Sequence, residues 1–343
     1  MKRIAAFSKY LAYEMGGAEA STRELLAKAA GEGAAITVIS QRKATFLGKT
    51  MSLAKMPAGY QFIEMDNMVN SPRSAYLEYA LNAERLRTYF AALDFDELWT
   101  YGTLAPAAAI GFAGPVRYYI RSESDIGITG NYQVGLKRLI KHAHNLAQWP
   151  AIQRYRQDLR LALSRSTVVA NSDYMSGQVK QRFGIDSQVN VPSIDIVPIA
   201  QGLRLHGRRP TDVVFVGDSS WKGLDIVQAL ARHLPETSFS IYSRLVANSQ
   251  TERNVTWHGW TNEPWRIYQR AKLVIVPSQC IEGYGRVSRE ARLLGIPVLV
   301  SDTGGLPESV DHDQECIVKD YKSLPSWLHA IRERLAAMPA STP

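Results

Sequence analysis

Two carboxylates, Glu282 and Glu290, stand eight positions apart around a glycine-rich turn, Gly283-Tyr284-Gly285. A carboxylate accepts hydrogen bonds and donates none, so such a pair suits a ligand rich in hydroxyl groups. The turn follows a strand-like run and opens into a helix-like one, and the unpaired amides and dipole of a helix start attract phosphate. Hydroxyls and phosphate on one ligand describe a sugar nucleotide. The alternative for the pair alone is a surface glutamate and an ordinary acidic residue near a helix N-terminus.

The surrounding residues favour the sugar-nucleotide interpretation. Across residues 277–310 the chain continues with Gly295-Ile-Pro, another strand-like run and a second glycine turn, Gly304-Gly305. Ligands of α/β proteins bind at the carboxyl ends of parallel strands, which is where both turns fall. We therefore expect this segment to form a binding site.

Two other turns carry groups suited to phosphate. Lys222-Gly223 follows the strand-like run 212–216, and an ammonium there would stabilise a departing diphosphate more than the intact ligand. Without the neighbouring glycine and strand, Lys222 would be interpreted as a surface lysine that starts a helix. Gly16-Gly17 follows the first strand-like run and is either a ligand-binding turn or a plain tight turn.

The elements that must position these residues alternate along the chain. Short apolar runs with helical stretches between them predict parallel sheets flanked by helices, and two sheets are favoured over one large sheet. The periodicity breaks at Gln188–Asp212, so we expect domains over 1–200 and 201–343 with a ligand cleft between them. The predicted strands are Arg3–Ser8, Ile36–Ser40, Glu97–Tyr101, Val116–Ile120, Thr167–Asn171, Asp212–Val216, Ser238–Ser243, Asn254–Trp257, Leu273–Pro277 and Pro297–Ser301.

Composition describes a globular protein with an anionic partner. The chain has 343 residues, 45% of them hydrophobic and 21% charged, with a formal net charge of +8 and a pI of about 9.4. No apolar run approaches the roughly 20 residues of a membrane span, and the start lacks a signal-peptide pattern. The two cysteines, Cys280 and Cys316, have no metal-ligand spacing, so we expect the cytoplasm. No nucleic-acid-binding motif occurs, and we expect no nucleic-acid partner.

Residues 277–310 resemble the sugar-donor segment of the family 4 retaining glycosyltransferases. That family has the GT-B fold, an α/β architecture of two Rossmann-like parallel-sheet domains facing across a cleft. Its pattern there is Glu-Gly-aromatic-Gly, a second glutamate eight residues after the first, Gly-x-Pro-Val, and Gly-Gly-x-Pro-Glu. Similarity extends to Gly16-Gly17-Ala-Glu19, Ala170-Asn-Ser-Asp-Tyr, and Phe215-Val-Gly with Lys222-Gly223.

The resemblance implies an activity and a set of site residues. A hexosyl residue would move from a UDP- or GDP-sugar to a hydroxyl of a glycan or lipid-linked acceptor, with retention and without a metal or other cofactor. Glu282 would position the sugar, Glu290 would hold the ribose diol, and Lys222 would stabilise the diphosphate. The base would lie near Gly259–Glu263. The other implied residues that bind the sugar donor are Gly16, Gly17, Gly283, Tyr284, Gly285, Arg286, Val287, Gly304 and Gly305.

The chain departs from the family pattern at the diphosphate. Asp218 stands where the family usually has an arginine that acts with the lysine. Arg244 or Arg286 would then have to supply the second cation.

A second departure concerns the acceptor. Many family members carry a histidine after the fourth strand of the first domain, and this chain has Arg121-Ser-Glu-Ser-Asp125 there. We expect Glu123 to join the catalytic residues. Glu19, Arg121 and Asp125 are expected to face the acceptor.

Two further patterns carry weaker implications. Asp94-Phe-Asp96 could hold a nucleotide-bound metal, but a solvated loop before a buried strand explains it more simply. Residues 134–166 combine lysines, arginines, Trp149 and Tyr155 among leucines, which suits either an anionic membrane surface or a solvated helical face. We therefore expect a cytoplasmic protein with possible attachment to the inner face of the membrane.

Other functions remain open at this stage. A GT-B phosphorylase or a nucleotide-sugar hydrolase would use the same pocket. A non-catalytic GT-B subunit that binds or scaffolds is motivated by the absent arginine and histidine, whereas the intact Glu282, Glu290, Lys222 and glycine turns favour catalysis.

Overall fold

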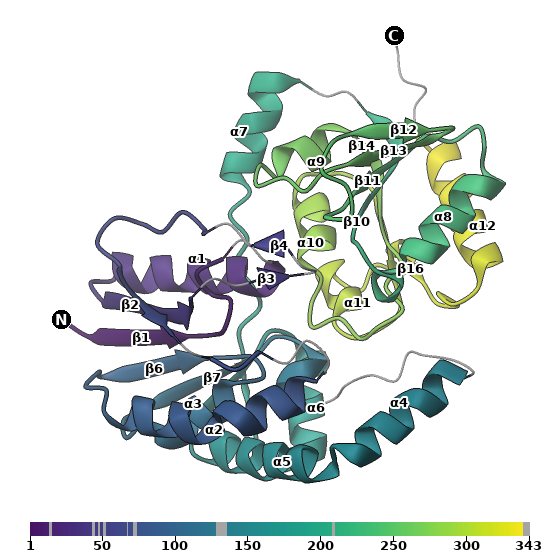
Figure 1. Cartoon of the computed structure of the whole chain (residues 1–343). Helices are drawn as coiled ribbons and strands as arrows, with labels where there is room; N and C mark the ends of the chain where they lie inside the picture. The colour runs from purple at the N-terminus through teal and green to yellow at the C-terminus, as the bar shows by residue number, and fades with distance from the viewer. Residues whose placement is uncertain are drawn as a thin grey trace. The chain divides into compact units, whose positions relative to one another are not determined.

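The computed structural model describes residues 1–13, 16–42, 45–46, 49–50, 53–66, 68–70, 74–127, 136–207 and 210–338. The chain divides into two compact units, Met1–Ser193 and Ile194–Pro343. Each unit holds a seven-stranded sheet with helices on both faces (Figure 1). The two sheets confirm the predicted α/β architecture of two parallel-sheet domains.

The sheet of the first unit has the order β5-β2-β1-β6-β7-β8-β9, with every pair parallel. One face packs on α2, α3, α5 and α6, and the other packs on α1 (Figure 1). The strands are β1 (Arg3–Phe7), β2 (Ala35–Gln41), β5 (Gln61–Met65), β6 (Glu97–Thr100), β7 (Val116–Ile120), β8 (Thr167–Ala170) and β9 (Gln188–Val189), with the separate pair β3 (Thr45–Phe46) and β4 (Lys49–Thr50). The helices are α1 (Gly17–Gly31), α2 (Ala75–Ala91), α3 (Ala105–Gly111), α4 (Leu136–Ala147), α5 (Trp149–Ser164), α6 (Asp173–Phe183) and the 3₁₀ turn η1 (Glu123–Ile126).

The sheet of the second unit has the order β12-β13-β11-β10-β14-β15-β16, with only β12 antiparallel among its pairs in the described chain. Helices α8 and α12 cover one face, and α7, α9, α10 and α11 cover the other. The strands are β10 (Thr211–Val216), β11 (Phe239–Tyr242), β12 (Gln250–Glu252), β13 (Val255–His258), β14 (Ala271–Val276), β15 (Val298–Ser301) and β16 (Ile317–Val318). The helices are α7 (Val197–His206), α8 (Leu224–His233), α9 (Trp265–Gln269), α10 (Arg286–Leu293), α11 (Leu306–Ser309) and α12 (Leu324–Ala336), with 3₁₀ turns η2 (Ser220–Lys222) and η3 (Gln314–Cys316).

Both sheets contain a point where the strand order reverses. In the first unit β1 lies between β2 and β6, and in the second unit β10 lies between β11 and β14. The loops at the carboxyl ends of such strand pairs diverge, which leaves room for a ligand. Loops of this kind carry Gly16 and Gly17 after β1, Lys222 after β10, and the Gly283–Gly285 turn after β14.

The division between the two units falls between Ser193 and Ile194, and residue 200 lies inside α7. Pro198 stands in the first turn of α7. Proline is tolerated there because its missing amide would be unpaired in any case.

Candidate active site

Three loops of the second unit meet at the carboxyl ends of β10, β14 and β15. The amide of Gln279 donates to the carbonyl oxygen of Trp221 at 2.7 Å, and the amide of Gly305 donates to the carbonyl oxygen of Glu282 at 2.9 Å. Gly304 has a φ of 60°, and a methyl group there would lie 2.2 Å from the Glu282 carbonyl oxygen. The structure therefore brings the two predicted glycine turns and Lys222 together.

Lys222 and Glu282 form an ion pair at the centre of these loops. Lys222 Nζ lies 2.6 Å from Glu282 Oε1 and 2.8 Å from Oε2, and the Ser278 hydroxyl donates to Oε1 at 2.6 Å. The Lys222 side chain is 46% exposed and that of Glu282 is 16% exposed. Burial alone would raise the pKa of Glu282, but the Lys222 ammonium and Ser278 hydroxyl outweigh it and lower that pKa. Glu282 is consequently an ionised acceptor at neutral pH, and Lys222 is its counterion.

The turn Gly283–Gly285 leads directly into α10. Gly285 is the N-cap, and it has no side chain to bind the first amides of the helix, which begins at Arg286. Tyr284 is buried and Val287 packs against the core beneath the sheet. The positive end of the α10 dipole can attract an anion here.

Glu290 lies one turn into α10 and is nearly buried, with 5% exposure. Arg286 Nε donates to its Oε1 at 2.6 Å, and the Tyr268 hydroxyl donates to its Oε2 at 2.6 Å. These two donors fix the orientation of the Glu290 carboxylate, a group that accepts hydrogen bonds and donates none. The hydrogen bond from Tyr268, on α9, could not be predicted from the sequence, because no residue spacing links α9 to α10.

The position of the missing arginine is filled by a pair of opposite charges. Asp218 Oδ2 lies 3.3 Å from Arg244 Nη1, and the Arg244 guanidinium lies 3.6 Å from the ring centre of Trp260. Gly259 precedes this tryptophan, and a methyl group there would lie 2.6 Å from the Ala247 carbonyl oxygen. Arg244 is thus placed beside Asp218, while Arg286 is engaged by Glu290.

In the first unit, Gly16 and Gly17 begin α1 and Glu19 stands in its first turn. The Tyr101 hydroxyl, after β6, donates to Glu19 Oε1 at 3.4 Å. Burial raises the pKa of Glu19, and Arg23 acts against this. The turn and the acidic residue therefore lie at the reversal point of the first sheet.

The residues after β7 form a tight corner. Asp125 accepts hydrogen bonds from the amides of Arg121, Ser122 and Gly102 at 2.8, 2.7 and 2.9 Å. It joins the loops after β6 and β7, so its carboxylate has a structural explanation beside the predicted acceptor role. Glu123 and Arg121 are both buried, at 8% and 7% exposure.

The Asp94 and Asp96 pair has a structural explanation as well. Arg3 donates to Asp94 Oδ1 and Oδ2 at 3.1 Å each, and its amide donates to Asp96 Oδ2 at 2.7 Å. These residues tie the starts of β1 and β6 together, at the edge opposite the glycine turns. Within the described residues, no group of three or more His, Cys, Asp or Glu side chains could hold a metal ion.

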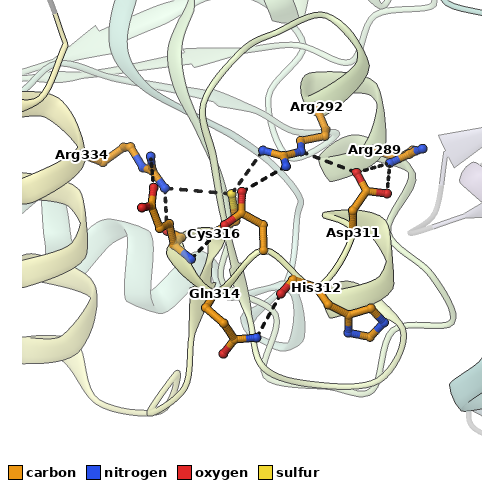
Figure 2. A network of polar contacts seen from close by, with 9 residues as sticks. Arg289, Arg292, Asp311, His312, Gln314, Cys316 and Arg334 are labelled. Carbon is orange, nitrogen blue, oxygen red and sulfur yellow. Dashed lines mark hydrogen bonds and ion pairs between the residues drawn. The ribbon is translucent and has the colours of Figure 1, made fainter.

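A second polar network lies around η3 (Figure 2). Arg289 and Arg292 on α10 bind Asp311, and Arg334 on α12 donates to the Glu315 carbonyl oxygen at 2.7 Å. Burial raises the pKa of the Cys316 thiol between these arginines. The segment Asp311–Asp313 is a polar turn that precedes β16 at the edge of the sheet.

Comparisons with known structures support the fold. Sucrose-phosphate synthase from Thermosynechococcus elongatus superimposes with a TM-score of 0.71 at 16% identity, covering 98% of this chain and 90% of that chain. HepE from Anabaena, in complex with UDP-glucose, gives 0.61 at 19% identity over 97% and 89% of the two chains. WaaG, a glycosyltransferase involved in lipopolysaccharide biosynthesis, gives 0.64 at 14% identity over 97% and 90%. The chain is a GT-B protein.

The second unit carries the similarity to a known family. The family model "Glycosyl transferases group 1" matches residues 209–336. D-inositol 3-phosphate glycosyltransferases from Corynebacterium jeikeium and Segniliparus rotundus are 29% and 28% identical over 41% and 54% of this chain. The matches span 31% and 48% of those relatives' lengths.

Proposed function

We propose that the chain is a retaining family 4 glycosyltransferase that moves a hexosyl residue from a UDP- or GDP-sugar to a hydroxyl acceptor. The Lys222–Glu282 pair carries the proposal, because it places a cation and a hydroxyl acceptor side by side where the strand order reverses. Support comes from HepE, whose structures hold UDP-glucose or UDP and glucose. The acceptor would be a glycan or lipid-linked molecule of the cell envelope.

The residues of the second unit would have separate roles in the sugar transfer. Lys222 and the amides of the Gly283–Gly285 turn stabilise the charge on the departing diphosphate. Glu282 accepts hydrogen bonds from the sugar hydroxyls, and Glu290 accepts them from the ribose. The bond from the anomeric carbon to the diphosphate breaks, the acceptor oxygen bonds to that carbon on the same face, and the diphosphate takes the acceptor's proton.

We propose that this transfer needs no metal ion. The Asp94 and Asp96 carboxylates are paired with Arg3 and lie at the amino ends of the strands. Turnover with EDTA should equal turnover with added Mg²⁺, measured as release of nucleoside diphosphate. A large loss in EDTA that Mg²⁺ restores would refute this.

A thermal-shift panel with UDP, GDP, ADP, CMP, dTDP and their sugar conjugates tests the function. A ligand at 100 times its dissociation constant stabilises the fold by about 2.7 kcal/mol, a shift that is easily measured. A response to one nucleotide sugar that is lost in Glu290→Ala identifies the class of sugar donor. Product analysis with and without acceptor then separates transfer from hydrolysis and phosphorolysis.

A non-catalytic subunit is the second candidate, and one observation favours it. Asp218 replaces the expected arginine and binds Arg244, which places a negative charge beside the diphosphate position. If no nucleotide sugar shifts the melting temperature, this candidate replaces the enzyme.

We also propose that α4 attaches the protein to an anionic membrane surface. Ile140 and Leu146 on α4 and Trp149 at the start of α5 are 61%, 74% and 49% exposed. Leu136, Leu139, Ile140, Ala143 and Leu146 recur at helical spacing opposite basic residues, which is the pattern of an interfacial helix. The side chains of Leu136–Leu139 and Lys141 lie outside the described residues. Among the helices that are described, none has the length and apolar character to cross a membrane.

A further inference from the structure

Arg121 is a buried arginine, and two of its guanidinium nitrogens lack hydrogen-bond acceptors. It follows β7, is 7% exposed, and neither its Nε nor its Nη2 has a hydrogen-bond partner. The group lies 5.0 Å from the ring centre of Tyr119 and 5.7 Å from that of Tyr101. These rings hold the guanidinium in place, but they do not satisfy its N–H groups. A buried cation without a hydrogen-bonded counterion is strongly destabilising, which points to a partner that the chain itself does not supply.

The two unsatisfied nitrogens lie on one edge of the guanidinium. The Nε and Nη2 edge presents two parallel N–H groups, the fork that binds both oxygens of a carboxylate or two oxygens of a phosphate. The nearby carboxylates have other partners. Asp125 accepts three backbone amides, and Glu19 accepts the Tyr101 hydroxyl.

Asn171 provides a second unsatisfied group beside this one. Ile120 pairs with Ala170 across β7 and β8, so Arg121 and Asn171 follow neighbouring strands at the same level. The Asn171 amide donates through Nδ2 to the Arg121 carbonyl oxygen at 3.0 Å, which fixes the amide orientation and leaves Oδ1 buried without a partner. An unsatisfied acceptor requires a donor such as a hydroxyl group.

Both side chains lie on the same side of the sheet. Tyr119 and Val169, two residues earlier on their strands, pack in the core that faces α1. Side chains two positions apart point to the same face of a strand, so the Arg121 and Asn171 groups share that face. The uncapped start of α1 at Gly16 also belongs to this end of the unit.

We propose that Arg121 and Asn171 bind an acceptor that carries an anionic group, a phosphate or a carboxylate, next to a hydroxyl. The Arg121 edge binds two oxygens of the anion, and Asn171 Oδ1 accepts from the hydroxyl. The inference rests on the proposed function, since it assigns the acceptor class of that reaction. Solvent does not reach the two nitrogens, so a neighbouring side chain moves when the ligand binds.

Calorimetric titration of the full chain with glucose 6-phosphate, glucuronate and glucose tests this. At least one anionic sugar should bind more tightly than glucose, and Arg121→Met should weaken that binding roughly 10- to 100-fold. Arg121→Lys keeps the charge but loses the pair of parallel N–H groups. Its affinity for the anionic sugar should therefore lie between those of the parent and Arg121→Met. Arg117→Met is the matched control, because Arg117 is on the same strand and pairs with Glu97 at 2.8 Å.

The melting temperature without ligand distinguishes binding from a structural role. Arg121→Met should melt higher than the parent, since it removes an uncompensated buried charge, whereas Arg117→Met should melt lower. Equal affinity of the parent for glucose and both anionic sugars, or an Arg121→Met variant that binds them as tightly as the parent, overturns the proposal.

Two further measurements separate the ligand source and the underlying function. Binding of phosphatidic acid vesicles that glucose 6-phosphate displaces, and that Arg121→Met loses, identifies a lipid headgroup as the anion. If glucose 6-phosphate binds but displaces no vesicles, the acceptor is a soluble molecule. UDP-glucose should shift the melting temperature of Arg121→Met as it does the parent. If no nucleotide sugar shifts the melting temperature while the anionic sugar still binds, the glycosyltransferase proposal is wrong and the anion site remains supported.

Discussion

Lys222 and Glu282 hold opposite charges together at the position where a nucleotide sugar would need both of them. Lys222→Ala should lower kcat by roughly 10²- to 10³-fold, with a smaller change in affinity, because its charge acts mainly on the leaving diphosphate. Steady-state release of nucleoside diphosphate measures both parameters. Lys272→Ala is a control, since Lys272 pairs with Asp212 instead at 2.9 Å. A parent-like kcat for Lys222→Ala would contradict the assignment.

Glu290 should act on binding more than on turnover. Glu290→Ala should raise the dissociation constant of the nucleotide sugar about tenfold or more, since hydrogen bonds to a charged group are worth about 1.5–3 kcal/mol. Tyr268→Phe, which removes one positioning bond at 2.6 Å, should give a smaller loss. Titration with the nucleotide identified by the thermal panel provides the comparison. Equal losses in kcat and in affinity would assign Glu290 to the chemical step.

His258 should make stability depend on pH. It is buried beside Tyr242, and burial, aided by Arg270, lowers its pKa from 6.5 to about 4. Between these values the unfolded chain binds a proton and the folded chain does not, so the free energy of unfolding falls as pH falls, by at most about 1.4 kcal/mol per unit. Urea titrations at pH 7 and pH 5 measure this. His258→Gln should flatten the dependence.

Among the elements, the glycine turn before α11 joins the site loops through close backbone contact. Gly304→Ala should lower the free energy of unfolding by roughly 1–3 kcal/mol, because it combines a positive φ with a collision against the Glu282 carbonyl oxygen. Gly295→Ala is the control, since its φ is 69° and a methyl group there meets no atom within 4 Å. If the two variants are equally stable, backbone strain alone explains the loss.

Apolar runs in the sequence predicted ten central strands, and all ten are present in the structure. The four edge strands β5, β9, β12 and β16 escaped prediction. Strands β9, β12 and β16 have only two or three residues, and β5 is mostly exposed, so none of them gives a clear apolar run. In the site, glycine spacing located Lys222, Glu282 and Glu290. Their contacts with Ser278 and Tyr268, and the unsatisfied state of Arg121, could not be predicted, because they depend on how separate elements pack.

For the whole molecule, the net charge of +8 and the exposed apolar residues of α4 predict attachment to anionic lipid. Leu146→Glu should reduce sedimentation with vesicles that contain phosphatidylserine and leave turnover on a soluble acceptor unchanged. Leu205→Glu, on α7 and 80% exposed, is the control substitution at another surface. Equal sedimentation of all three proteins would show that α4 is a solvated helix.

The ion pair between Lys222 and Glu282 affects how tightly the site would bind the released nucleoside diphosphate. Under the proposed function, a nucleoside diphosphate without a sugar would have to draw Lys222 away from Glu282 and would offer that carboxylate no hydroxyl in exchange. A nucleotide sugar would supply partners to both side chains at once. The empty site should therefore prefer fresh substrate to product, so that product inhibition is weak and the reaction continues when the cellular pool of free nucleotide rises.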